Sequence, residues 1–264
     1  MLSGVWIEVV ALVAAFAVAV VTTPAGVSGA VLLLPFQVSV LGTPSPSVTP
    51  TNLLYNVVAC PGAMWRYWRQ GQTGGTLTWL LLAGTLPGVV AGSVIRVYVL
   101  PGPVVFDFVV AAVLIPLGSW LALAPVNHAT GGRGRLPRVV TGALAAVAGC
   151  VGGIYGIGGG SILAPILIAD GRPASQVAPA ALSSTFVTSL GGVVTFSLLS
   201  LSHQGSIAPD WPTGIALGIG GLAGGYAGAQ MHARMPEALI RRLLALVVVA
   251  IGIRFLVAGL TGGT

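Results

Sequence analysis

The sequence has very little charge. Only 6% of its 264 residues are charged, whereas soluble domains carry about 25%. Lysine is absent, all eleven basic residues are arginines, and five residues are acidic. Together with 55% hydrophobic residues and a mean hydropathy of +0.98, this scarcity excludes a soluble domain and indicates a polytopic protein of the lipid bilayer. The arginines lie between apolar runs and are expected to set membrane orientation, so the net charge of +6 does not indicate a nucleic-acid partner.

Reactive and metal-binding groups are also scarce. The two cysteines, Cys60 and Cys150, lie in apolar sequence without the spacing of a metal site, and packing is favoured over a thiol relay for Cys60. The lack of a phosphate-binding lysine motif argues against ATP hydrolysis. No Asp, Glu or His falls clearly at the centre of an expected span, which weakens a proton relay built on such groups. We therefore expect no metal, no cofactor and no enzymatic activity.

Glycine, by contrast, is abundant and concentrated. Six of the nine residues 152–160 are glycines, in the middle of an apolar run over residues 139–169. Each glycine in a helix interior costs roughly 1 kcal/mol relative to alanine, so the run predicts a helix that breaks inside the bilayer and restarts near Ser161. Irregular backbone is tolerated there only where it lines a cavity or is buried in protein. A restarted helix also directs free N–H groups toward that cavity, and the expected occupant is an anion.

The rest of the chain alternates apolar runs with short loops, which predicts an all-α membrane fold. A first broken run covers residues 2–41, and residues 51–66 predict a helix about 24 Å long, short of the roughly 30 Å hydrocarbon core. Further spans are expected over residues 76–100, 104–123, 178–201, 212–232 and 238–260. The longest polar stretch, residues 125–137, is interpreted as a linker between two halves, 1–124 and 138–264.

The two halves resemble each other. Gly29 and Pro35 align with Gly159 and Pro165 at an offset of 130. A Gly-x3-Gly-x3-Gly run over residues 84–92 aligns with another over 220–228 at an offset of 136, and both are expected to pack helices closely within the chain. Each half thus has a broken run followed by three helices. Internal repeats with interrupted helices in matching positions are the best sequence indication of a transporter's binding site.

The arginines distinguish parallel from inverted repeats. If each broken run crossed the membrane once, the eleven arginines would divide six against five. If each run enters and returns as a hairpin, nine arginines share one side and only Arg96 and Arg254 lie on the other. The positive-inside rule favours the second arrangement, with inverted repeats, both termini outside and the linker in the cytoplasm. For Arg96 and Arg254, snorkelling to the outer face is then favoured over the alternative that they draw anions to a vestibule.

Polar residues next to the breaks are the candidate site. Hydroxyls, amides and backbone N–H groups bind an oxyanion without burying a full positive charge. The candidates are Ser28, Gly29, Thr51, Asn52 and Asn56 in the first half, and Gly158, Gly159, Gly160, Ser161, Ser183, Ser184 and Thr185 in the second. The group 183–185 is expected in the first turns of its helix. Each residue alone would equally suit helix capping or helix packing, but two matched clusters favour binding.

Two other functions use the same residues. Gly26-Val27-Ser28-Gly29 matches the short nucleophile motif of rhomboid-type intramembrane proteases, in which Ser28 would need His203 or His232 as its partner. The match is only four residues long in a chain with 39 glycines, and the second-half counterpart lacks the serine. A passive anion channel of the same fold is the second alternative.

The motif Gly156-x-Gly158-Gly159-Gly160-Ser161-x3-Pro165, followed by Val177-Ala178-Pro179-Ala180 and Ser183-Ser184-Thr185, resembles the sulfite exporter TauE/SafE family. The resemblance covers nearly the whole chain, although the first half departs from the pattern at residues 26–30 and 51–56. It implies a multi-pass carrier of the cell inner membrane for a small sulfur-containing anion such as sulfite, an organosulfonate, sulfoacetate or thiosulfate. Alternating access would move an anion bound near the midplane. The direction of transport, proton or ion coupling and a homodimer are left open.

Overall fold

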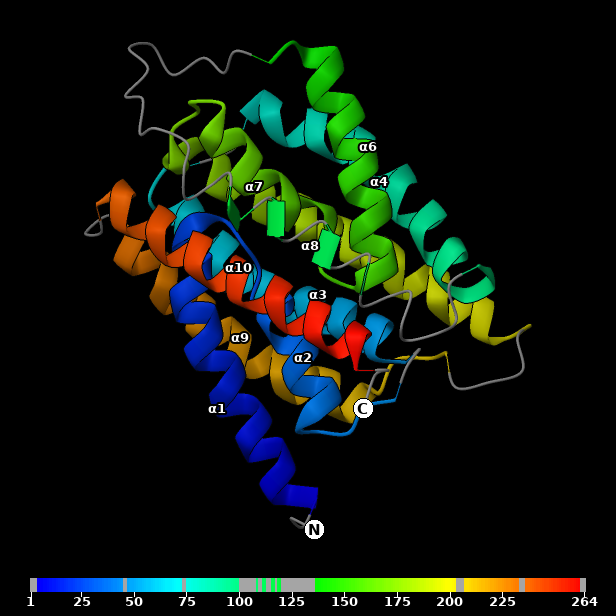
Figure 1. The fold of residues 1–264 in the computed structure, drawn as a ribbon. Coiled ribbons are helices and arrows are strands. Elements are labelled where there is room, and N and C mark those ends of the chain that lie inside the picture. The colour runs from blue at the N-terminus through cyan, green and yellow to red at the C-terminus, as the bar shows by residue number, and fades with distance from the viewer. Residues whose placement is uncertain are drawn as a thin grey trace.

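The computed structural model describes residues 4–44, 47–72, 75–99, 136–202, 207–232 and 236–261, with isolated positions between 108 and 119. This part of the chain is all-helical and contains no strand (Figure 1). Its helices are α1 (Gly4–Thr22), the 3-10 turn η1 (Thr23–Ala25), α2 (Ala30–Ser39), α3 (Val48–Arg69), α4 (Gly75–Tyr98), α6 (Arg138–Tyr155), α7 (Gly159–Ala169), α8 (Ala174–Ser200), α9 (Trp211–His232) and α10 (Glu237–Leu260). Most of the expected span 104–123 and of the linker 125–137 lies outside the described residues.

Several helices have the dimensions of membrane spans. Within the described residues, α4, α6 and α8 are long and apolar enough to cross a membrane. The expectation of a short helix over residues 51–66 was wrong: α3 has 22 residues and is about 33 Å long, enough to cross. The helix was expected to begin after Pro50, but proline is tolerated in the first turn, where its missing N–H costs no helical hydrogen bond.

Both predicted breaks are present. α6 ends at Tyr155, Gly156 adopts a left-handed φ of 75°, and α7 begins at Gly159. In the first half η1 ends at Ala25, Gly26 has a left-handed φ of 72°, and α2 begins at Ala30. These two glycines are 130 residues apart, the offset that relates the halves. The left-handed region favours glycine because other side chains clash with the backbone there, so each break depends on this residue type.

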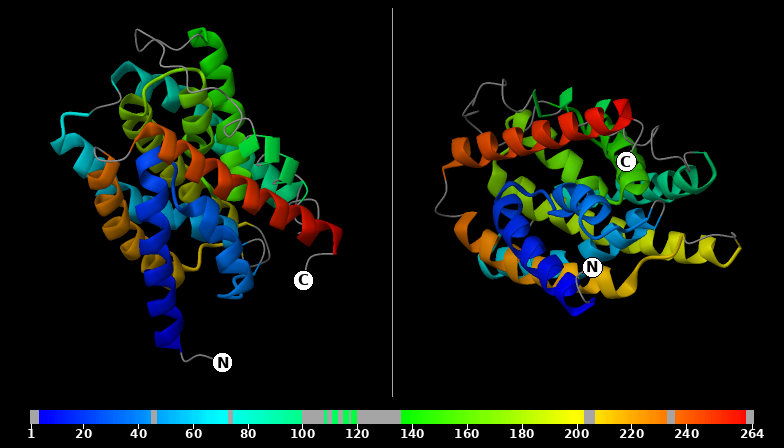
Figure 2. Two further views of the ribbon diagram at one scale, coloured as in Figure 1. Left: turned by 60° about the vertical axis from the view of Figure 1, so that its left-hand side comes forward. Right: turned by 60° about the horizontal axis from the view of Figure 1, so that its bottom comes forward.

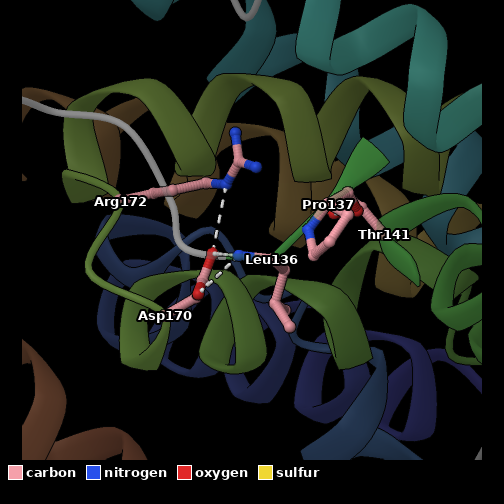
Figure 3. A network of polar contacts seen from close by, with 5 residues as sticks. All are labelled: Leu136, Pro137, Thr141, Asp170 and Arg172. Carbon is pink, nitrogen blue, oxygen red and sulfur yellow. Dashed lines mark hydrogen bonds and ion pairs between the residues drawn. The ribbon is translucent and has the colours of Figure 1, made fainter. Parts of the chain in front are cut away.

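The second broken run returns to the side from which it starts. The Asp170 carboxylate, just after α7, accepts the Leu136 N–H at 3.1 and 3.3 Å, just before α6 (Figure 3). It also lies 3.6 Å from the Arg172 Nε. The two ends of the α6–α7 pair therefore meet. α2 and α7 have 10 and 11 residues, about 15 and 17 Å, so the returning helices are short, as the sequence predicts.

The first helix of each half packs on the other half. α6 lies along α4, and α1 lies along α9. A β-carbon on Gly88 would lie 2.3 Å from the Ala146 carbonyl oxygen, and one on Gly224 would lie 2.2 Å from that of Phe16. The two contacts are equivalent in the two halves. Gly88 and Gly224 are related by the offset of 136, and Phe16 and Ala146 by the offset of 130. The Gly-x3-Gly-x3-Gly runs thus pack helices within this chain, as predicted.

The two first helices run in opposite directions. α1 begins at the lower side of the molecule and rises, whereas α6 begins at the top and descends, in Figure 1 and in the left view of Figure 2. α10 ends on the lower side in the same views. The equivalent helix pairs, α1 with α9 and α6 with α4, are therefore oppositely oriented.

Neighbouring glycines of α9 test this packing. Gly224→Ala is expected to lower thermal stability by roughly 1–3 kcal/mol, because the added methyl group would overlap backbone that cannot rotate away. Gly225→Ala is the matched control, since its β-carbon would lie 3.6 Å from its nearest neighbours. That variant should be neutral or slightly more stable. Thermal unfolding of the purified protein in detergent is the measurement, and equal melting of the two variants would contradict the helix contact.

Candidate functional site

The two breaks contact each other in the interior. The Ser28 N–H, from the first break, donates to the Ser161 Oγ, in the first turn of α7, at 3.1 Å. The Ser161 Oγ also lies 3.4 Å from the Thr185 Oγ1 of α8. All three residues are buried. The predicted candidates Ser28, Ser161 and Thr185, from two halves of the chain, are thereby brought into one cluster.

Asn56 of α3 joins both breaks. Its Oδ1 accepts the hydroxyl of Ser28, and its Nδ2 donates to the Gly156 carbonyl oxygen at 3.4 Å. Asn56 is fully buried, so its amide is held by protein groups on both sides. An amide suits this position because it supplies both an acceptor and donors, which a hydroxyl or a carboxylate does not do with the same geometry.

Asn52, one turn before Asn56, anchors the start of α2. Its Nδ2 donates to the Ala30 carbonyl oxygen at 2.9 Å, and its Oδ1 accepts from the Gln37 Nε2 at 2.8 Å. Gln37 is fully buried and was not among the predicted residues. The available signal was its position as the one amide side chain in the apolar sequence of α2, residues 30–39.

The glycines at the start of α7 allow close helix contact. A β-carbon on Gly160 would lie 1.9 Å from the Ala181 carbonyl oxygen of α8. One on Gly159 would lie 2.7 Å from the Thr85 Cγ2 of α4. In the first half, one on Gly29 would lie 2.5 Å from the Tyr55 hydroxyl. Any larger residue would push the restarted helices away from the polar side chains that surround them.

The three residues 183–185 separate from one another. The sequence predicted these residues in the first turns of their helix, but α8 begins at Ala174, so they lie in its third and fourth turns. Thr185 faces Ser161, whereas the Ser184 Oγ lies 2.9 Å from the Thr85 Oγ1 of α4. Ser183 lines a lateral pocket of about 620 Å³ with aromatic residues that include Trp65, Trp79 and Phe186. The structure therefore brings Ser184 to α4 and leaves Ser183 away from the Ser28 cluster.

Thr51 also lies apart from the breaks. Its hydroxyl donates to the Ser47 carbonyl oxygen at 2.7 Å, and the Asp210 N–H donates to that hydroxyl at 2.8 Å. These bonds tie the beginning of α3 to the segment before α9. The hydrogen bonds of Thr51 therefore support the fold at this point.

Arg96 is the largest departure from expectation. It was expected to snorkel to the outer face, but its side chain is fully buried at the end of α4. Its Nε donates to the Thr49 Oγ1 at 3.4 Å, and that hydroxyl donates to the Ile154 carbonyl oxygen at 3.2 Å. Thr49 thus links the Arg96 cation to Ile154, which lies two residues before Gly156 of the second break. Buried arginines in membrane proteins are costly and usually functional, whereas the Arg254 side chain is exposed.

The remaining candidate chemistries receive little support. Cys60 is buried and forms no disulfide, in agreement with a packing role. The Ser28 hydroxyl is bound to an amide oxygen, which does not activate it as a nucleophile. Within the described residues, no group of three His, Cys, Asp or Glu side chains is placed to hold a metal ion.

These features define a class of protein: a multi-pass membrane protein whose interrupted helices bring polar side chains together in its interior, as in secondary transporters. The comparison with protein families identifies it further. The chain belongs to the sulfite exporter TauE/SafE family, whose model matches residues 11–255.

Two curated proteins are similar to this chain. A probable membrane transporter protein of Xylella fastidiosa (strain 9a5c) is 26% identical over 242 residues, which cover 86% of this chain and 87% of that protein. The probable membrane transporter protein YunE of Bacillus subtilis (strain 168) is 31% identical over 118 residues, 45% of this chain and 41% of YunE. The family is one of transporters and not of enzymes, so the protease alternative is set aside.

The buried Arg96 and the exposed Arg254 were both expected at the outer face, so substitutions at the two positions can be compared. Arg96→Gln is expected to lower stability by roughly 1–3 kcal/mol, because it leaves the Thr49 hydroxyl without its donor and opens a cavity. Arg254→Gln, at an exposed position, should change stability by less than about 0.5 kcal/mol. Thermal unfolding in detergent compares the two, and a similar loss in both variants would argue against the distinct role of the buried arginine.

Proposed function

We propose that the protein is a secondary transporter of small sulfur-containing anions, such as sulfite, an organosulfonate, sulfoacetate or thiosulfate. The observation that carries this proposal is the direct contact of the two breaks through Ser28 and Ser161. At this point two helix starts, those of α2 and α7, meet side chains of α3 and α8. Helix starts and neutral donors are among the groups with which proteins bind oxyanions.

The donors of this cluster favour an anion over a cation or a neutral solute. The first turn of α7 has no side-chain cap, so its N–H groups are available to a ligand. Asn56, Ser161 and Thr185 add amide and hydroxyl donors, and Arg96 adds a positive charge nearby. Among the described residues, no carboxylate takes part in the hydrogen bonds that join the cluster, so nothing in those bonds repels an oxyanion.

The fold proposed for this function is an inverted repeat with a helical hairpin at the start of each half. The opposite directions of α1 and α6, the equivalent glycine contacts and the meeting of Leu136 with Asp170 support it. On this proposal the linker 125–137 is cytoplasmic and both termini are outside. The repeats 1–124 and 138–264 then enter the membrane from opposite sides, and their breaks meet near the midplane.

The tight glycine contacts suggest which parts move. α1, α3 and α9 form one packed bundle, and α6, α8 and α4 form its equivalent. Each bundle contains helices of both repeats, so the moving unit would be a bundle and not one half of the sequence. α3 and α8, the helices that bear Asn56 and Thr185, face each other where the bundles meet. Movement of the bundles about this contact would alternate access to an anion between them.

The site is tested by sulfite uptake into proteoliposomes. The double variant Asn56→Ala, Thr185→Ala is expected to lower kcat/KM for sulfite by roughly a hundredfold to ten-thousandfold, since each of the two lost bonds to an anion is worth about 1.5–3 kcal/mol. Thr195→Val is the control, because this α8 hydroxyl is bound to the Gly191 carbonyl oxygen at 2.8 Å, away from the cluster. Normal flux in a correctly folded double variant would refute the site, and flux that never saturates would favour a channel.

A further inference from the structure

One buried hydroxyl near the breaks has no partner. Ser189 of α8 is fully buried, and its Oγ forms no hydrogen bond with any residue that the structure describes. Other buried helix hydroxyls bond back to the carbonyl oxygen four residues earlier: Thr85 to Leu81 at 2.8 Å, Ser93 to Val89 at 2.8 Å and Thr188 to Ser184 at 2.7 Å. Ser189 does not use this option, so its proton remains available for a ligand.

The location of this hydroxyl is the second break. A β-carbon on Gly158, the residue before α7, would lie 3.1 Å from the Ser189 Oγ and 2.7 Å from the Thr185 Cγ2. Ser189 lies one turn after Thr185, on the same side of α8. The Oγ therefore faces the uncapped start of α7, where N–H groups also lack side-chain partners.

We propose that Ser189 is a further anion-binding residue of this transporter, which donates its hydroxyl proton to an oxygen of a sulfur oxyanion at the start of α7. This inference rests on the proposed function and extends it, because Ser189 was not among the residues expected from the sequence. Gly158 permits this approach, because it has no side chain to separate the Ser189 Oγ from the start of α7. A buried hydroxyl without a partner lowers the stability of the ligand-free protein, and the bound anion reverses that loss.

The proposal predicts opposite effects on stability and affinity. Ser189→Ala removes a buried group that lacks a partner, so the ligand-free protein should melt at the same or a higher temperature than the unaltered protein. The same change should weaken sulfite binding by about tenfold or more, the effect of one bond to a charged ligand. Binding is measured from the rise in melting temperature with sulfite concentration, and transport from the KM for sulfite in proteoliposomes.

Thr188→Val is the matched control, because the neighbouring hydroxyl is also fully buried but is bound within its own helix. It should leave the sulfite affinity unchanged. If Ser189→Ala binds sulfite as tightly as the unaltered protein, the proposal is overturned, and a lower melting temperature in that case would assign the hydroxyl to a bound water. If the unaltered protein neither binds nor transports any sulfur oxyanion tested, the proposed function itself fails, which is a distinguishable result.

Discussion

The structure depends on one constraint: a helix that stops inside a lipid bilayer exposes peptide groups that must find partners in the protein. The hydrogen bond from the Ser28 N–H to the Ser161 Oγ meets this constraint for one such group, with a partner from the opposite half of the chain. Asn56 adds a second bridge, since it accepts from Ser28 and donates to Gly156. The two breaks therefore stabilise each other, and the place where they do so is the place where polar groups gather.

The exchange of first helices keeps the breaks together. Each glycine face, on α4 or α9, fits the first helix of the other half, so neither half buries its first helix alone. The contacts are to backbone carbonyl oxygens, and at this separation only glycine fits without a steric clash. Two packed bundles result, and the cluster lies where α3 of one contacts α8 of the other. A binding site in that position is compatible with transport, because a small displacement of one bundle changes the surroundings of every polar group in it.

Much of this organisation follows from the sequence, because glycine clusters and their offset of 130 residues are local signals with direct backbone consequences. The orientation of single side chains did not follow. The sequence around Arg96 is the same whether its side chain points to water or to the protein interior. Its partner in the interior, Thr49, belongs to a different helix, so the local sequence does not reveal the contact. Residues 183–185 share a composition, but successive helix positions differ by about 100°, so the three reach different neighbours. Gln37 and Ser189 were missed because only tertiary contacts distinguish them from ordinary packing residues.

The central claim is that the two breaks enter the membrane from opposite faces, and labelling of single cysteines tests it most directly. In a chain with Cys60 and Cys150 replaced, Ser3→Cys and Thr264→Cys should react with a membrane-impermeant maleimide added to intact cells. Gly134→Cys, in the linker, should react only after the membrane is opened. That pattern would place the halves in inverted orientation. Reaction of Ser3→Cys and Gly134→Cys from the same face would contradict the account, because the two hairpins would then enter from one side.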